Sequence, residues 1–331
     1  MTHFNGRRRT DMRAMVIRPQ DDALELRDVP SPVPDRGELL VAVAASGVNR
    51  ADLLQRRGAY TQIAFPQREP RIAGMEAAGT VIATGPDVTR FSPGDRVMGL
   101  CAGGFAERVV LDARLALPVP AELDMVAAGA LPLGLMTEYD AMAGAGRLRP
   151  GERVLITAGS SGVGLIGVQV ARALGAGRVI ATVRSDAGRE AVLRQGADEA
   201  VVTGERWPDT LPEADLVIDH VGAPALAGAL AALPLGGRLV SVGRLGGRTA
   251  QLDMNELARK RLLLAGVTFR TRTREECAAI AAGAVRDLGE AVRAGTVRPA
   301  VARTFPLAAA QEAQDLPRDA RGPGKVVVIP G

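Results

Sequence analysis

The sequence predicts an α/β protein with a doubly wound parallel sheet and a second, N-terminal domain that is antiparallel and barrel-like. Residues 12–130 contain short strand-like stretches separated by frequent Gly and Pro turns. After residue 150, apolar strands alternate with helical segments. A length of 331 residues, with 47% hydrophobic and 24% charged residues, is enough for two globular domains.

The first domain is expected to begin after a flexible tail, residues 1–11. A loop entering a short helix is predicted at 46–60. Two further strands, 97–100 and 106–111, are predicted to pair with each other around Gly103 and Gly104. The other predicted strands are 12–18, 24–29, 39–45 and 77–83. The last strand, 325–329, is expected to return to this domain and complete its antiparallel part.

The parallel sheet follows a helical segment at 125–145. Its predicted strands are 153–157, 178–182, 200–202, 216–218, 238–242 and 262–269. Helices are expected between them, for example at 189–195 and 226–233, and a further helix at 274–294.

The chain is organised around the stretch 153–174, which predicts a buried strand, a glycine-rich turn and a helix over 164–174. Gly159, Gly162 and Gly164 let the backbone approach a pyrophosphate. The first turn of the helix offers unpaired N–H groups and the positive end of its dipole. The strand and helix that flank the glycines favour a dinucleotide site over the alternative, a purely structural turn.

The end of the second strand indicates which dinucleotide. NAD-binding units place a carboxylate about 20 residues past the turn, for the ribose hydroxyls. Here Val183 is followed by Arg184 and Ser185, which suit a 2′-phosphate, and Arg189 could add a second cation. The interpretation is NADP(H); the alternative is that these arginines only face solvent.

No metal site is expected, because the chain has two histidines and two well-separated cysteines. His220, at a strand end, could touch the cofactor or simply be packed. Asn49 and Tyr60 are the candidate catalytic residues, since an amide can donate to a carbonyl and a phenol can supply a proton. Each also has a structural alternative, as a turn residue and as a half-buried aromatic. Glu76 is expected to be a structural hydrogen-bonding acid.

Charge and apolar patterning exclude several classes. The net charge is +4, but the arginines are scattered and aromatics are only 3%, so nucleic-acid binding is not expected. No secretory signal or apolar span of membrane length is present. With the isolated cysteines, this predicts a cytoplasmic protein.

Several motifs occur in a specific order: GVNRADLLQRRGAY at 47–60, FSPGDRVMGL at 91–100, TAGSSGVGLIG at 157–167 and GKVVV at 324–328. With them, residues 12–331 resemble the zinc-independent medium-chain dehydrogenases/reductases, in particular the quinone oxidoreductase (zeta-crystallin-like) group. That resemblance implies a GroES-like catalytic domain (12–134 and 270–331), a Rossmann domain that binds NADPH (135–269) and a homodimer. It also implies no metal, since zinc-dependent relatives place ligands where this chain has Asn49 and Met75.

The residues and the resemblance together give one set of expected cofactor contacts: Thr137, Tyr139, Gly159, Ser160, Ser161, Gly162, Val163, Gly164, Arg184, Ser185, Arg189, His220, Val242, Gly243, Arg244, Phe269 and Lys325. The resulting hypothesis is metal-independent reduction of quinones or conjugated carbonyls by hydride from NADPH. One alternative is an enoyl-thioester reductase, which a basic groove would favour. Another is an NADPH-binding regulatory or RNA-binding protein with little turnover.

Overall fold

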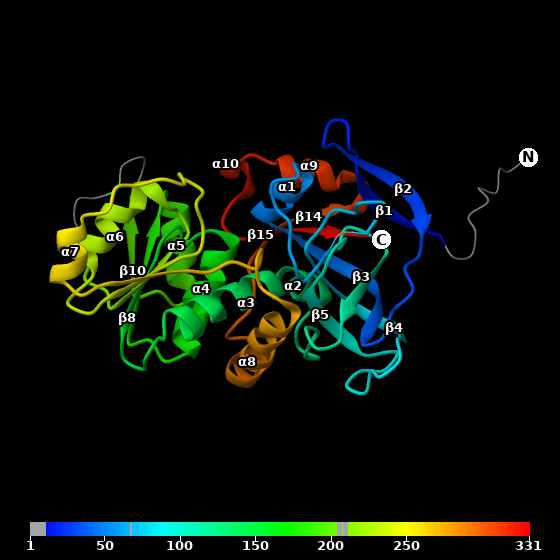
Figure 1. Cartoon of the computed structure of the whole chain (residues 1–331), viewed down its shortest axis with the longest axis horizontal. Helices are drawn as coiled ribbons and strands as arrows, with labels where there is room; N and C mark the ends of the chain where they lie inside the picture. Colours follow the sequence, from blue (N-terminus) through cyan, green and yellow to red (C-terminus); the bar gives the residue numbers. More distant parts are fainter. Residues whose placement is uncertain (1–10, 67, 204–206, 208–210) are drawn as a thin grey trace, which may run out of the picture.

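The computed structural model describes residues 11–66, 68–203, 207 and 211–331. Of the predicted tail, Asp11 already belongs to the first strand, and residues 1–10 lie outside the described residues. Two lobes lie side by side along the long axis, with helices α2 (Met125–Ala130) and α3 (Pro132–Tyr139) between them (Figure 1).

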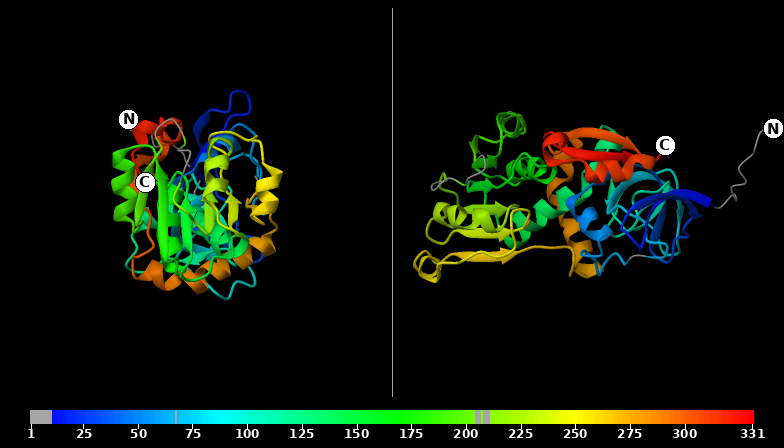
Figure 2. Two further views of the ribbon diagram at one scale, coloured as in Figure 1. Left: turned by 90° about the vertical axis from the view of Figure 1, so that its left-hand side faces the viewer. Right: turned by 90° about the horizontal axis from the view of Figure 1, so that it is seen from above.

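One lobe contains a 6-stranded sheet in the order β10-β9-β8-β11-β12-β13, in which every neighbouring pair is parallel. Helices lie on both faces of this sheet (Figure 2). The prediction of a doubly wound sheet is therefore confirmed. Its strands are β8 Arg153–Ile156, β9 Arg178–Val183, β10 Glu199–Val202, β11 Leu216–Asp219, β12 Arg238–Ser241 and β13 Leu263–Gly266. Its helices are α4 Gly162–Ala173, α5 Asp186–Arg194, α6 Leu226–Ala232 and α7 Met254–Arg259.

The other lobe contains a 7-stranded sheet in the order β14-β15-β3-β4-β5-β7, with β6 also paired to β3. Its strands are β3 Glu38–Val48, β4 Glu76–Thr84, β5 Arg96–Leu100, β6 Arg108–Asp112, β7 Leu117–Pro118, β14 Val301–Pro306 and β15 Lys325–Ile329. A separate antiparallel pair is formed by β1 (Asp11–Ile17) and β2 (Leu24–Pro30). The neighbouring pairs of the 7-stranded sheet are antiparallel except β14 and β15, which pair parallel at its edge. The prediction of an antiparallel domain is confirmed apart from that pair, and so is the return of β15, which pairs antiparallel with β3.

The predicted pairing of 97–100 with 106–111 is wrong. β5 pairs with β4 and β7, and β6 pairs with β3. The reason lies in the intervening glycines, whose N–H groups donate to the carbonyl of Gly74, at 2.9 Å from Gly103 and 3.1 Å from Gly104. The chain is thereby drawn away from a hairpin and across the sheet.

The remaining elements connect the lobes or cover them. A π-helical segment, Asp140–Ala145, continues α3, and α8 (Arg274–Arg293) packs against α3 and α4. The shorter elements are α1 Arg50–Arg56, the 3₁₀ turns Ala223–Ala225 and Leu307–Ala309, α9 Ala310–Asp315 and α10 Arg318–Arg321. One apolar cluster runs from β5 through α3 to the parallel sheet and α8, so the two lobes share a core. Among the described residues, no helix has both the length and the apolar composition needed to cross a bilayer.

Candidate active site

The glycine-rich turn joins β8 to α4 with bare backbone. Helix α4 begins at Gly162, two residues earlier than expected, because the Ser161 hydroxyl caps it by accepting from the N–H of Gly164 at 3.0 Å. A Cβ atom on Gly164 would lie 2.6 Å from the carbonyl oxygen of Ala158, and one on Gly159 would lie 2.7 Å from Cβ of Ala181. Only glycine fits at these two positions. The open first turn of α4 suits a phosphate group, so these residues fit a dinucleotide.

The candidate 2′-phosphate residues lie together at the end of β9, which is the neighbour of β8. Arg184, Ser185 and Arg189 are all exposed. Ser185 also has a structural task, because its hydroxyl oxygen caps α5 by accepting from the N–H of Gly188 at 3.2 Å. The Ser185 O–H is still able to donate. Contact of these side chains with a phosphate stays a prediction.

The ends of β11 and β12 form a tightly bonded loop pair. The Asp219 carboxylate accepts from the Thr157 hydroxyl at 2.7 Å and from the N–H groups of Val221 and Gly222, both at 3.0 Å. The N–H of Gly243 donates to the carbonyl of Asp219 at 3.0 Å. A Cβ atom on Gly243 would lie 2.4 Å from the carbonyl oxygen of His220, so the second loop approaches the first closely.

His220 points into the protein. Its Nε2 lies 2.8 Å from Glu138 Oε1, and both side chains are buried. Burial lowers the pKa of His220, but the charge and hydrogen bond of Glu138 outweigh it and raise the pKa above its ordinary value. In this arrangement the His220 imidazole binds α3 through the Glu138 carboxylate.

Two other expected cofactor contacts, Tyr139 and Phe269, already have partners inside the protein. The Tyr139 hydroxyl donates to Asp287 Oδ2 on α8 at 2.6 Å. Burial, and to a smaller extent Asp287, raises the pKa of Tyr139 to about 12. Phe269 belongs to the shared apolar core and is buried. In this structure the Tyr139 hydroxyl is bound to Asp287, whereas Phe269 belongs to the apolar cluster against which Val242, another expected contact, also packs. Contact of Tyr139 or Phe269 with a cofactor stays a prediction. Thr137, two positions before Tyr139 on α3, is partly exposed.

A buried polar cluster lies where the two lobes meet, and it consists of Asn49, Glu76 and Lys325. Their exposed fractions are 5%, 0% and 3%. Lys325 Nζ donates to Glu76 Oε1 at 2.7 Å and to Asn49 Oδ1. Glu76 Oε2 accepts from the N–H of Leu133 at 2.8 Å, so Glu76 is the structural hydrogen-bonding acid that the sequence suggests.

Lys325 also reaches the glycine turn. A Cβ atom on Gly162 would lie 2.6 Å from Lys325 Cδ, and Gly324 forms a bridge with Ser161. One lysine thus packs its stem against the turn and places its ammonium group between Asn49 and Glu76. Within the described part of the chain, no group of three or more His, Cys, Asp or Glu side chains could hold a metal ion.

This cluster uses both amide hydrogens of Asn49. Its Nδ2 donates to Glu76 Oε1 at 2.7 Å and to the carbonyl of Gly47 at 3.3 Å. In this arrangement Asn49 has no N–H left for an acceptor oxygen, which was its expected role. Its backbone N–H donates to Asp52 Oδ2 at 2.6 Å. Burial, with a smaller contribution from Glu76, raises the pKa of Asp52 to about 7.

Tyr60 lies at the edge of a groove of about 490 Å³. The Arg270 guanidinium lies over its ring, with Cζ 5.3 Å from the ring centre. Burial raises the pKa of Tyr60, against the opposing effects of the Thr268 hydroxyl and of Arg270 and Arg244. The phenol is therefore protonated at neutral pH. The groove is lined by Thr61, Ile63, Arg244, Gly266, Val267, Thr268, Arg270 and Thr271.

Sequence reasoning missed Thr268 and Arg270 in this groove. The only signal was the basic alternation Arg270, Arg272, Arg274, which by itself is typical of a solvated surface. Arg272 bonds Asp140 at 2.7 Å, and Arg274 lies 3.9 Å from Asp112. Of these three arginines, it is Arg270 that faces Tyr60.

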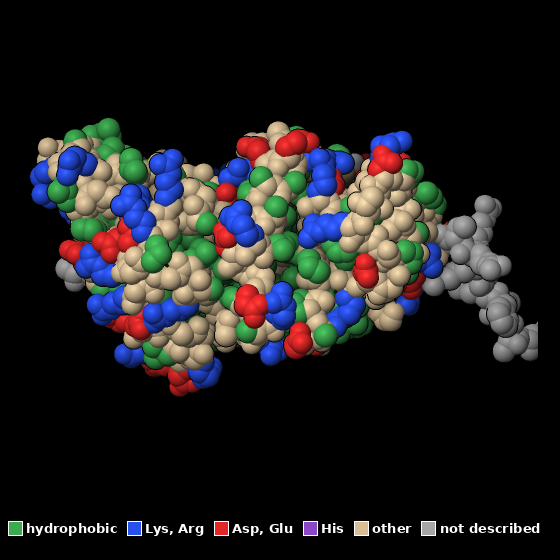
Figure 3. All heavy atoms as spheres, turned by 90° about the horizontal axis from the view of Figure 1, so that it is seen from below, with side chains coloured by type: hydrophobic (Ala, Val, Ile, Leu, Met, Phe, Trp, Pro, Cys, Tyr) green, Lys and Arg blue, Asp and Glu red, His purple; other side chains and the backbone are tan. Residues whose placement is uncertain are grey.

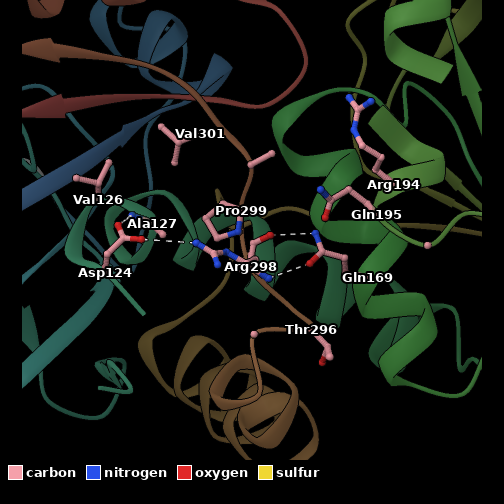
Figure 4. A pocket seen from close by; sticks show the side chains of 13 residues that line it. Asp124, Val126, Ala127, Gln169, Arg194, Gln195, Thr296, Arg298, Pro299 and Val301 are labelled. Carbon is pink, nitrogen blue, oxygen red and sulfur yellow. Dashed lines mark hydrogen bonds and ion pairs between the residues drawn. The ribbon is translucent and has the colours of Figure 1, made fainter. Parts of the chain in front are cut away.

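A second hollow, of about 660 Å³, contains none of the expected site residues (Figure 4). The Gln169 side chain crosses it from α4, donating to the carbonyl of Arg298 and accepting from its N–H, both at 2.9 Å. The Arg298 guanidinium lies 3.6 Å from Asp124. The polar groups of this hollow thus bind one another and join α4 to the segment that leads into β14.

Comparison with known proteins agrees with this architecture. Residues 35–121 match the family described as alcohol dehydrogenase GroES-like domain, and residues 162–284 match the one described as zinc-binding dehydrogenase. Quinone oxidoreductase of Lama guanicoe is 30% identical over 312 residues, which are 91% of this chain and 92% of that protein. The chain belongs to the medium-chain dehydrogenase/reductase family. It is an oxidoreductase of that family.

Other relatives carry different names. Acryloyl-coenzyme A reductase of Metallosphaera sedula is 29% identical, over 96% of this chain and 99% of that protein. Polyketide synthase GfsB of Streptomyces halstedii is 33% identical over 89% of this chain, which spans only 5% of that protein. Among solved structures, the quinone oxidoreductase from Thermus thermophilus, also described in its complex with NADPH, has a TM-score of 0.80 and 34% identity, covering 96% of this chain and 100% of that one.

Proposed function

We propose that this medium-chain reductase uses NADPH to reduce quinones or other conjugated carbonyls, without a metal ion. The observation that carries the proposal is the bare glycine turn between an arginine-bearing strand end, at Arg184, and a groove beside Tyr60. A nicotinamide cofactor, when bound, supplies a hydride and two electrons. The protein's contribution is to hold the cofactor and acceptor in line and to limit water.

The residues of this chain divide that work. Gly159 to Gly164 would receive the pyrophosphate and Arg184 the 2′-phosphate. Lys325 and Glu76 fix Asn49, the N-cap of α1, and the stem of Lys325 packs against the turn. Tyr60 keeps its proton at neutral pH and is the candidate donor or orienting group for the acceptor oxygen.

The test measures the oxidation of NADPH by a panel of quinones, through the loss of absorbance at the nicotinamide band. We expect turnover with NADPH to exceed that with NADH, and to be unchanged by a chelator. Loss of turnover in the chelator, or a strong preference for NADH, would contradict the proposal. A homodimer is proposed as well, and sedimentation measures it.

Two other functions are compared with this proposal, because each would give a different result. An enoyl-thioester reductase is favoured by the two arginines of the groove beside Tyr60. An NADPH-binding regulatory or RNA-binding protein would bind NADPH without oxidising it and bind RNA in a salt-sensitive way. Basic and acidic side chains are interspersed on the face drawn in Figure 3, an arrangement that does not favour a nucleic-acid surface there.

A further inference from the structure

Two arginines, Arg244 and Arg270, line the groove beside Tyr60. Within the described part of the chain, neither forms an ion pair, and both are exposed. Carboxylates are not scarce nearby, since Arg272 and Arg274 both pair with one. The groove therefore keeps two guanidinium groups available, and a guanidinium fork matches phosphate oxygens in two parallel hydrogen bonds.

These arginines do not serve the same phosphate as Arg184. Arg184 follows β9, whereas Arg244 follows β12 and Thr268 follows β13. The sheet order places β8 and β11 between them. A dinucleotide that crosses the turn after β8 has its adenosine at the β9 side, so the groove lies at the other end, where the acceptor enters.

The groove also has an apolar wall. Two of its lining residues are Ile63, which is 65% exposed, and the buried Val267. A neutral quinone would use the apolar wall but would leave both guanidinium groups without an anionic partner. A ligand with an apolar arm and a phosphate uses both.

We propose that this groove binds the phosphorylated pantetheine arm of an enoyl thioester, with Arg270 and Arg244 holding its phosphate. This assigns Arg244, predicted from the sequence as a cofactor contact, to the substrate instead. The proposal rests on the hydride transfer proposed above and names its substrate class. In the reaction, hydride from the nicotinamide forms a C–H bond at the β-carbon, and a proton from solvent or Tyr60 is added at the α-carbon. The C=C bond is reduced to C–C, and NADPH is oxidised to NADP⁺.

The first test is binding without the cofactor. Calorimetry would measure the affinity of the purified protein for acetyl-coenzyme A, a saturated thioester that cannot be reduced. We expect Arg270→Gln to weaken it about tenfold, and Arg270→Lys to weaken it less. The matched control is Arg303→Gln, which removes an exposed arginine on β14, outside the groove. Equal affinity in Arg270→Gln and Arg303→Gln would overturn the proposal.

The second test compares three crotonyl thioesters with the wild-type protein and NADPH: coenzyme A, pantetheine 4′-phosphate and N-acetylcysteamine. We expect kcat/KM to be at least about tenfold higher for the two phosphorylated thioesters than for the uncharged one. If kcat/KM is higher still for the coenzyme A thioester than for the pantetheine phosphate thioester, the substrate recognised is a free coenzyme A thioester. Equal kcat/KM values for those two thioesters would indicate that the groove recognises only the phosphopantetheine arm. Equal values for all three would overturn the proposal.

The two proposals fail in different ways. Reduction of quinones without reduction of any crotonyl thioester would overturn the groove assignment and leave the proposed function standing. Absence of NADPH oxidation with every acceptor would overturn the proposed function. The acetyl-coenzyme A titration would still decide whether Arg270 binds the phosphate.

Discussion

The candidate dinucleotide site has an exposed end, where β9 ends, and a buried end, where the two lobes meet, and the two are built in opposite ways. At the end of β9, Arg184, Ser185 and Arg189 are exposed and lie on a single loop and the helix that follows. Where the lobes meet, Asn49, Glu76 and Lys325 are buried, and they come from three distant parts of the chain. The exposed end can act through charge on a ligand from solvent. The buried end holds its charges for one another.

This difference in burial implies that substitutions at the two ends differ in how much they destabilise the fold. A buried ammonium and a buried carboxylate each lose solvation, and only their mutual contact and added hydrogen bonds offset the loss. Removing either partner therefore harms the fold itself. Removing an exposed arginine harms mainly whatever it binds.

The largest expected effect is that of Lys325→Met. It leaves the Glu76 carboxylate buried without its cation, and we expect the free energy of unfolding to fall by about 3–5 kcal/mol. Urea unfolding followed by circular dichroism measures it. The matched control is Lys260→Met: this partly exposed lysine donates to carbonyls such as that of Leu233 at 2.9 Å, so about 1 kcal/mol is expected.

The double variant Lys325→Met, Glu76→Gln sharpens the same point. It removes both charges, and we expect it to recover much of the lost stability, because no unpaired ion is left inside. A Lys325→Met protein as stable as Lys260→Met would show that the cluster does not need its cation, and the contrast between the two ends would fail.

A pH effect is expected next, at Asp52, beside the buried cluster. Its pKa rises from 3.8 to about 7 on folding, so the folded protein retains a proton that the unfolded chain has released. Stability must therefore fall as the pH rises from 3.8 towards 7. Asp52→Asn removes this loss and retains an oxygen for the N–H of Asn49.

We expect the stability of Asp52→Asn, relative to the wild type, to increase by roughly 1 kcal/mol per pH unit between about pH 5 and 7 and then to level off. Urea unfolding at several pH values measures it. A difference that stays constant over that interval would mean that Asp52 titrates normally despite its burial.

The exposed end was predictable from the sequence because it is local. The strand, the glycine turn and the helix follow one another within residues 153–174, and Arg184 follows the next strand. The return of β15 was also predictable, since an apolar strand after the parallel sheet needed a partner. These features depend on periodicity and on neighbours along the chain.

The buried end was not predictable in the same way. Lys325 and Glu76 are 249 residues apart, and no spacing rule joins them. Asn49 was predicted to donate to an acceptor oxygen, but its amide hydrogens are used by Glu76 and Gly47, which only the tertiary contacts could reveal. The pairing of 97–100 with 106–111 failed for a similar reason, because distant backbone at Gly74 captured the glycines between them.

The smallest expected effect on stability, and the one most specific for binding, belongs to the exposed end. Arg184→Ala removes the cation at the end of β9, and we expect the Kd for NADPH to rise about tenfold while that for NADH stays the same. Fluorescence titration of each cofactor measures both. The control is Arg194→Ala, an exposed arginine on α5 that lies 3.4 Å from Glu190; there, both constants should be unchanged. The Arg184 effect should also shrink as salt rises, because an exposed charge is screened. Equal losses for NADPH and NADH would mean that Arg184 shapes its loop instead of reading the 2′-phosphate, and the two ends would then both be structural.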